Sequence, residues 1–276
     1  MNPHQAHSTS LLEIYDSFIR NRPLIGQMAK REVLGRYRGS VIGLGWSFFN
    51  PLLMLGVYTF FFSFVFKSRW GAVQDAGHAN FAIILFVGLI IHGLFAECIN
   101  RAPSLIISNV NYVKKVVFPL EILPWIAMGS ALFHAGISVL VLLALQLIIV
   151  GSLPWTIIFF PLIVIPLILV TLGLAWFLAA TGVFVRDIGQ ITGMIISVLL
   201  FVSPVFYPIS ALPSGVRSLV MLNPLTLIIE ESRKVLLFGE MPNWSGLGVY
   251  SLVGIAIAWI GFWWFQKTRK GFADVL

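Results

Sequence analysis

Charged residues are scarce in this chain: Asp, Glu, Lys and Arg together make up 11% of its 276 residues. Soluble domains carry about 25% charged residues. Because 58% of this sequence is hydrophobic, a soluble globular protein and a disordered chain are both excluded. The single cysteine, Cys98, excludes an internal disulfide. The composition that remains is that of a polytopic membrane protein.

Three chemical signatures are also missing from the sequence. No Lys-Ser or Lys-Thr pair follows a glycine loop, so the chain has no P-loop for a nucleotide. No Cys and His residues have the spacing of metal ligands. His92, His134 and Glu97 are the titratable side chains in or near the apolar runs, and none has an evident partner. Hydrogen-bonded packing accounts for the two histidines as well as a functional role does. The energy source for transport is therefore expected on another polypeptide.

Long stretches without charge predict an all-α integral membrane protein with six transmembrane helices. Ile122 to Val185 holds no formal charge, and one helix of those 64 residues would be about 96 Å long. The Gly151-Ser152-Leu153-Pro154 turn therefore divides this run into two spans. The predicted spans are about 41–66, 81–99, 122–150, 156–183, 188–207 and 244–265.

Basic residues predict the orientation of these spans. Of the 18 Lys and Arg residues, 13 fall on the side that holds both termini, and five fall on the other side. The positive-inside rule therefore places both termini in the cytoplasm. This distribution also accounts for the sequence pI of about 9.8 without a nucleic-acid partner.

Two segments do not fit a simple set of spans. Residues 1–38 are predicted as a cytoplasmic segment with an amphipathic interfacial helix, which Pro23 divides in two or opens in its second half. Residues 39–276 form the predicted six-span transmembrane domain. Ser218 to Ile229 is apolar but too short to span a bilayer, so 205–240 is predicted as a re-entrant helical pair rather than an ordinary loop.

Five stretches, in the order in which they occur, resemble the permease subunits of type-two ABC exporters, and most closely the branch that exports O-antigen, capsule or teichoic acid. The resemblance extends over nearly the whole chain from about Leu24. The stretches are RYRGSVIGLGWSFFNPLLMLGVYTFFFSFVF (36–66), NYVKKVVFPLEILP (111–124), FVRDIGQI (184–191), SPVFYPISALP (203–213) and LNPLTLIIEESRKVLLFG (222–239).

The resemblance implies a bacterial inner-membrane protein that acts as a homodimer with two copies of a separate ATPase subunit. ATP and Mg would bind to that ATPase, and this chain would hold no cofactor and catalyse no reaction. The implied substrate is a glycan on a polyprenyl-pyrophosphate carrier, moved through a channel lined by spans one and five. The family also implies a coupling loop at about 102–115 and a periplasmic gate at about 205–240. The coupling candidates are Ser104, Ser108, Asn109, Asn111, Lys114 and Lys115, and the gate candidates are Asn223, Pro224, Glu230, Glu231 and Arg233.

Two sets of side chains suit the substrate chemically. Basic side chains before span one can hold a pyrophosphate through charge-assisted hydrogen bonds, although they also fit a purely topogenic role. Aromatic rings offer sugar C–H faces a sliding surface, although lipid-facing rings are common in spans. The pyrophosphate candidates are Lys30, Arg31, Arg36 and Arg38, and the path candidates are Trp46, Phe49, Tyr58, Phe62, Phe201, Phe206 and Tyr207.

Two alternatives remain from the sequence. A type-two ABC exporter of a drug or lipid would keep the same architecture and change the cargo. An intramembrane lipid-linked sugar transferase would need acidic or nucleophilic residues clustered at one membrane face, and the sequence shows no such cluster.

Overall fold

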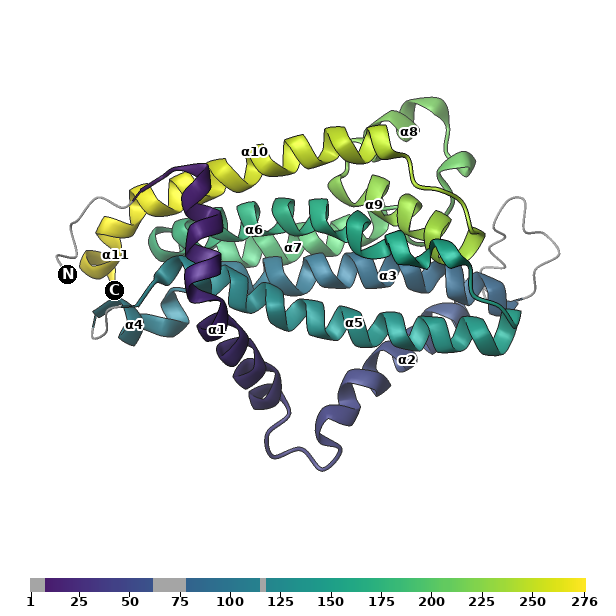
Figure 1. The fold of residues 1–276 in the computed structure, drawn as a ribbon, viewed down its shortest axis with the longest axis horizontal. Helices are drawn as coiled ribbons and strands as arrows, with labels where there is room; N and C mark the ends of the chain where they lie inside the picture. Colours follow the sequence, from purple (N-terminus) through teal and green to yellow (C-terminus); the bar gives the residue numbers. More distant parts are fainter. Residues whose placement is uncertain (1–7, 62–77, 115–117) are drawn as a thin grey trace.

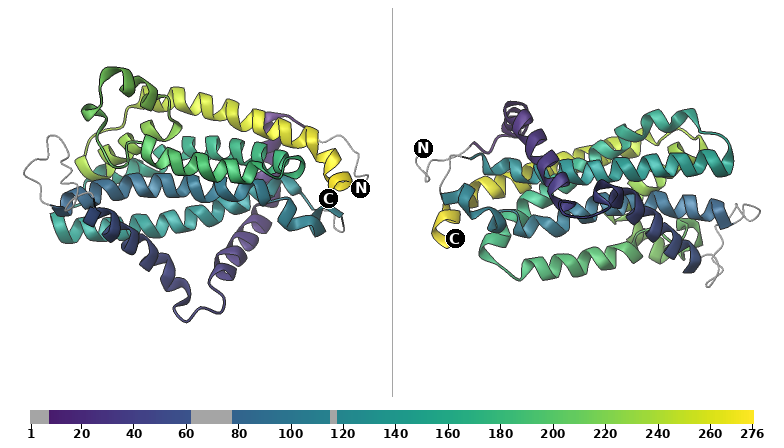
Figure 2. Two further views of the ribbon diagram at one scale, coloured as in Figure 1. Left: turned by 180° about the vertical axis from the view of Figure 1, so that it is seen from behind. Right: turned by 90° about the horizontal axis from the view of Figure 1, so that it is seen from below.

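The computed structural model describes residues 8–61, 78–114 and 118–276, and their regular structure is entirely helical. The all-α prediction is therefore confirmed for the described residues. Five helices lie side by side along the longest axis, and α1 and α2 form a V beside them (Figures 1 and 2). These five are α3 (His78–Arg101), α5 (Leu123–Val150), α6 (Phe160–Phe184), α7 (Ile188–Val202) and α10 (Trp244–Thr268).

Within the described residues, four continuous helical stretches are long and apolar enough to cross a membrane: Phe81–Ser104, Leu120–Val150, Trp155–Phe184 and Trp244–Val275. They coincide closely with predicted spans two, three, four and six. At the fifth position, α7 has 15 residues and ends before Pro204, so it is about 22 Å long rather than the predicted span. At the first position, α2 (Trp46–Thr59) has 14 residues.

The N-terminal segment differs from its prediction. It forms one continuous helix, α1 (Leu11–Arg36), with Pro23 inside it, rather than two short helices or a helix beginning at Pro23. Figure 1 shows α1 changing direction partway along its length, as an internal proline causes by removing one hydrogen bond. The helix begins at Ser10, whose Oγ accepts a hydrogen bond from the Leu12 amide at 3.3 Å.

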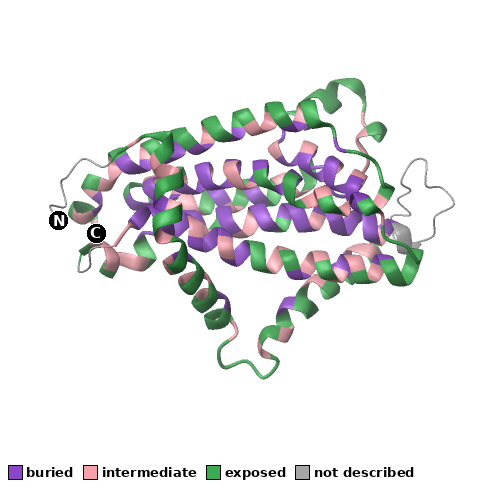
Figure 3. Cartoon of the chain, viewed as in Figure 1, coloured by how far each residue is buried: buried purple, intermediate pink, exposed green. Residues whose placement is uncertain are grey.

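The core lies along α3 and the helices packed on it. Figure 3 shows α3 as largely buried, whereas α1, α2 and the elbow between them (residues 37–45) are mostly exposed. The predicted turn after α5 is present, and Gly151 adopts a positive φ of 79° that ends the helix. The start of α1 and the end of the chain lie at one end of the bundle, where Trp259 Nε1 donates to the Thr9 carbonyl at 3.1 Å.

Short helices connect the bundle at its two ends. At the end that holds the start of α1, residues 102–114 form two 3₁₀ turns and α4 (Val110–Lys114), and α11 (Phe272–Val275) follows α10. At the opposite end, α8 (Ser214–Met221) and α9 (Pro224–Arg233) lie between α7 and α10 (Figure 1). Asn223 caps α9 through a 2.9 Å bond from the Leu225 amide.

Candidate transport site and coupling surface

Aromatic side chains of α2 and of the α7 end meet in one cluster. Phe206 lies 5.4 Å from Tyr58 and 5.6 Å from Phe201, measured between ring centroids. Phe206 is buried, while Phe201 is 63% exposed on the outer face of α7. Tyr207 adjoins this cluster, and its hydroxyl donates to the Val202 carbonyl at 2.7 Å. The structure therefore brings four of the predicted path residues together.

Two of the remaining path residues, Trp46 and Phe49, lie at the other end of α2. Trp46 and Phe49 are in edge contact at 6.4 Å, and Phe49 is 58% exposed. The Trp46 indole donates to Ser40 Oγ at 3.0 Å, which holds the ring over the elbow. Twelve residues separate Trp46 from Tyr58, about 18 Å along a helix. Phe62 lies outside the described residues.

The four predicted pyrophosphate ligands divide into two groups. Lys30, Arg31 and Arg38 line one surface hollow of about 430 Å³ on α1 and the elbow. All three are exposed, and Lys30 and Arg38 form no ion pair with the described residues. Arg36 points elsewhere and pairs with Glu97 of α3, with 2.7 Å between Nη2 and Oε1. Three of the four cations thus gather on one face, and the fourth, although partly exposed, is paired with a carboxylate of α3.

Glu97 and His134 do have partners, which corrects the expectation from sequence. His134 Nδ1 of α5 lies 2.9 Å from Glu97 Oε1, and His134 Nε2 lies 3.1 Å from the Tyr37 hydroxyl. With Nδ1–H donating to the carboxylate, Nε2 accepts the Tyr37 proton. The cluster Arg36, Tyr37, Glu97 and His134 ties the end of α1 to α3 and α5. His92 is separate and contacts the Ile196 carbonyl at 3.2 Å.

The predicted coupling residues form a polar outer surface on an apolar base. Ser104, Ser108, Asn111 and Lys114 are exposed, and Asn109 is half-buried with its amide donating to the Leu105 carbonyl at 2.8 Å. Lys115 lies outside the described residues. Underneath, the segment sits directly against α6. A Cβ added to Gly182 would lie 2.3 Å from the Pro103 carbonyl oxygen, so only glycine permits this contact.

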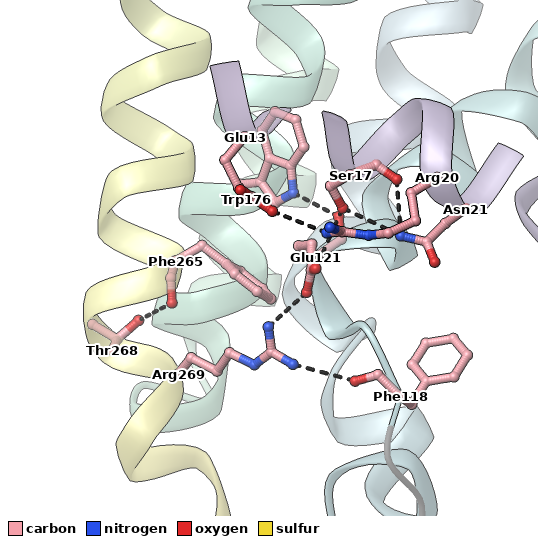
Figure 4. A network of polar contacts seen from close by, with 10 residues as sticks. All are labelled: Glu13, Ser17, Arg20, Asn21, Phe118, Glu121, Trp176, Phe265, Thr268 and Arg269. Atoms are coloured by element: carbon pink, nitrogen blue, oxygen red, sulfur yellow. Dashed lines mark hydrogen bonds and ion pairs between the residues drawn. The ribbon is translucent and has the colours of Figure 1, made fainter. Parts of the chain in front are cut away.

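Charged contacts anchor the 102–115 segment on both sides. Arg101 pairs with Glu32 of α1, and Arg31 donates to the Tyr112 hydroxyl at 3.2 Å. After the segment, Glu121 accepts a 2.6 Å bond from Arg269, which follows α10 (Figure 4). These contacts connect α1, the end of α10 and the segment into one unit.

The Glu121 network was not found from the sequence. Its other carboxylate oxygen accepts from Ser17 Oγ of α1 at 3.3 Å, and its carbonyl accepts from Trp176 Nε1 of α6 at 2.9 Å (Figure 4). A carboxylate inside the apolar run FPLEILP was the available signal, because a buried charge needs a partner. The partner that pairs with it, Arg269, lies 148 residues further along the chain, so no local sequence pattern identifies it.

Two charged residues of α9, Glu231 and Arg233, are buried, and Glu230 is half-buried. Arg233 is 1% exposed, and its guanidinium donates to the carbonyls of Ile84, Pro204 and Val205 at 3.2, 2.7 and 3.0 Å. It also pairs with Glu230 at 2.7 Å. Arg233 therefore fastens α9 to α3 and to the break that follows α7.

The other predicted gate residues fix the two ends of α9. Asn223 donates to Ser203 Oγ at 2.8 Å, and the Pro224 carbonyl accepts from the Tyr250 hydroxyl at 2.8 Å. Glu231 binds Lys234 at 2.7 Å and the Asn243 amide at 2.8 Å. The segment between α7 and α10 is thus held to the bundle by buried polar contacts.

The fold and these surfaces define a polytopic helical membrane protein with a polar segment anchored at one end of its bundle and a buried helix at the other. The chain belongs to the ABC-2 type transporter family, whose sequence signature matches residues 23–237.

Two bacterial export permeases and one bacterial transport protein resemble the chain over most of its length. It is 28% identical to the O-antigen export system permease protein RfbA of Myxococcus xanthus over 96% of this chain and 99% of that protein. It is 26% identical to an RfbA of Klebsiella pneumoniae over 92% of this chain and 95% of that protein. Identity to the polysialic acid transport protein KpsM of Escherichia coli is 22%, over 84% of this chain and 88% of that protein.

Proposed function

We propose that this chain is the membrane subunit of an ATP-driven exporter that carries a lipid-linked polysaccharide, most closely an O-antigen, across the bacterial inner membrane. The observation that carries the proposal is the similarity, over more than nine-tenths of this chain, to two O-antigen export permeases. The membership in the ABC-2 family supports the transport class. Because the sequence has no P-loop, hydrolysis belongs to two copies of a partner ATPase that bind ATP and Mg.

The 102–115 segment is the proposed docking surface for the ATPase on the cytoplasmic side. Its exposed serine, asparagine and lysine side chains suit a polar interface, and its charged contacts to α1 and α10 support a role in transmitting movement. This assignment places both termini in the cytoplasm, consistent with the distribution of basic residues.

The proposed route of the substrate runs from a cationic hollow near one end of the molecule to short helices at the other end. The hollow lined by Lys30, Arg31 and Arg38 binds the pyrophosphate of the carrier lipid at the inner interface. The glycan then passes along the aromatic rings of α2 and α7, which face the axis of a homodimer. The helices α8 and α9, at the far end, form the periplasmic gate. The proposed count is six spans per subunit, with α2 in the first crossing and α7 in the fifth.

Gene deletion with complementation tests the function, and bulky substitutions test the coupling surface. Deletion abolishes surface polysaccharide and leaves lipid-linked polymer in the cytoplasm; a deletion strain with normal surface polysaccharide would refute the proposal. Ser108→Trp and Asn111→Trp should each reduce recovery of the ATPase with the purified permease. The control Ser152→Trp changes an exposed serine at the opposite end of α5 and should leave both recovery and export unchanged.

A further inference from the structure

A cavity of about 390 Å³ lies between α2, α3 and α5, behind the elbow. Its size falls within the range of small-molecule sites, about 300–1,000 Å³. Polar residues of its lining come from all three helices and from the end of α1: Ser47 and Asn50 from α2, His92 and Glu97 from α3, His134 and Ser138 from α5, and Arg36 with Tyr37 beside the elbow. Such a mixture in an otherwise apolar bundle requires an explanation, because polar groups at membrane depth are costly unless they have partners.

One wall of the cavity already carries balanced charges. Arg36 is neutralised by Glu97 at 2.7 Å, and the imidazole of His134 lies between the Glu97 carboxylate and the Tyr37 hydroxyl. An anion placed there would either break the Arg36–Glu97 pair or lie beside the carboxylate. The Arg36–Glu97 pair therefore adds hydrogen-bonding groups without a net formal charge, in contrast to the three cations of the hollow on α1, which have no ion pair among the described residues.

The opposite wall contains an unsatisfied hydroxyl. Ser47 is 4% exposed and lines the cavity, yet its Oγ has no hydrogen-bond partner among the described residues. An unpaired buried hydroxyl costs about 1–3 kcal/mol, so its position is favourable when a ligand supplies the missing bond. Rings of Trp46 and Tyr58 line the same cavity and add flat apolar surface.

We propose that this cavity is a saccharide-binding pocket, which holds a sugar unit of the lipid-linked glycan beside the elbow. Hydroxyl and amide groups and a compensated ion pair next to aromatic rings match the hydroxyl groups and C–H faces of a sugar ring better than they match a phosphate or an acyl chain. The pocket is separate from the exposed rings of Phe49 and Phe201, which belong to the proposed path. The inference rests on the proposed function, because it takes its ligand from the exported polymer.

Photocrosslinking in living cells tests the pocket with the natural substrate. A genetically encoded diazirine amino acid replaces Ser138, which lines the cavity, or Leu140, which is exposed two residues further along α5. A third variant carries it at Phe201 on the path. After irradiation, the purified permease is stained for carbohydrate with periodate, and crosslinked peptides are analysed by mass spectrometry. We expect carbohydrate on the Ser138 and Phe201 variants and none on the Leu140 variant.

The three positions separate failure of the pocket from failure of the proposed function. Carbohydrate at Phe201 without carbohydrate at Ser138 would overturn the pocket and leave the exporter assignment standing. A polyprenyl or phospholipid adduct alone at Ser138 would also overturn it, because the cavity would then hold a lipid tail. Absence of carbohydrate at every position, in cells that still display polysaccharide, would refute both the pocket and the path.

A pair of serine substitutions provides a second test. The expected difference in export would not arise if Ser47 had a purely structural role. Ser47→Ala removes the unpaired hydroxyl of α2 that lines the cavity. Ser130→Ala is the control, because Ser130 of α5 is also buried and has no described hydrogen-bond partner but does not line the cavity. Neither change should lower the thermal unfolding midpoint. Ser47→Ala should reduce polysaccharide export at limiting expression about five-fold, the loss of one hydrogen bond to the ligand. Ser130→Ala should export normally. Equal export by the two variants, whether normal or reduced, would overturn the pocket.

Discussion

The pair α6–α10 and the helix α2 are packed in opposite ways. Between α6 and α10 the backbones touch: a Cβ added to Gly261 would lie 1.9 Å from the Gly173 carbonyl oxygen, and one added to Gly173 would lie 2.4 Å from the Ile257 carbonyl oxygen. In α2, by contrast, Gly56 has no neighbour within 4 Å of such a Cβ. Among the residues of α2, only Ser47 and Leu55 are buried.

This difference separates a rigid part of the molecule from a part that is free to move. Small residues let membrane helices approach closely and gain van der Waals contact, so α6 and α10 form one fixed unit. The elbow before α2 contains Gly39 and Gly43 at positive φ angles of 85° and 55°, a conformation that glycine adopts readily. Tyr37 of the elbow bonds to His134 of α5, and the adjoining Arg36 of α1 pairs with Glu97 of α3. A transporter needs both parts, a frame and a helix that changes position.

The largest effect is expected in the rigid part. Gly261→Leu places a side chain where the α6 backbone lies, so the two helices must separate. Overpacking costs about 1–3 kcal/mol and occasionally more, and a contact with backbone favours the upper end of that range. We expect the thermal unfolding midpoint of the purified protein to fall and the yield of monodisperse protein to decrease.

Gly56→Ala is the matched control in α2. The added methyl group meets open space, and alanine is about 1 kcal/mol more favourable than glycine in a helix interior. The midpoint should therefore stay the same or rise. If Gly261→Leu and Gly56→Ala lowered the midpoint equally, the contrast between the two regions would be wrong.

Much of this fold was predictable because periodicity and charge determine it locally. The charge-free runs predict α5 and α10 almost to the residue at their first positions, and the Gly151 turn was correctly located. Two short helices were expected within 205–240, whereas Asn223-Pro224 was interpreted only as a break; in the structure Asn223 caps α9 and Pro224 begins it. The Pro23 prediction failed because tertiary contacts of α1, such as Ser17 with Glu121, support a helix through the proline.

The site was less predictable because its partners are far apart in the chain. Arg36 was chosen for its positive charge, but its partner Glu97 lies on another helix, and no local pattern connects them. Arg233 was expected in a charge cluster, whereas its donors reach three backbone carbonyls that any sequence would provide. Lys30, Arg31 and Arg38 were grouped correctly because they lie on one helix and its end.

A smaller effect is expected at the Arg36–Glu97 pair, which attaches the end of α1 and the elbow to α3. Glu97→Gln removes the charge that binds Arg36 and leaves the helix packing of α3 in place. The pair is partly exposed, so its loss costs about 1–2 kcal/mol, between the values for exposed and buried pairs. Hydrogen exchange of the elbow peptide should therefore become about five- to thirty-fold faster. Glu13→Gln is the control, because Glu13 pairs with Arg20 within α1. Equal exchange in the two variants would show that the ion pair does not hold the elbow.

The smallest effect is expected for single exposed rings on α2 and α7. Phe49→Leu and Phe201→Leu keep most of the apolar volume at exposed positions and remove the ring face. If each ring contributes to the glycan path about 0.5–1 kcal/mol, as an aromatic contact does, export falls about two- to five-fold while the unfolding midpoint is unchanged. Phe177→Leu is the control, because Phe177 is also exposed but lies on α6 of the rigid pair, against Trp264. Its export should stay normal at equal expression. A similar decrease in all three variants would mean that the rings contact lipid or neighbouring helices, and that α2 and α7 do not offer a distinct aromatic path.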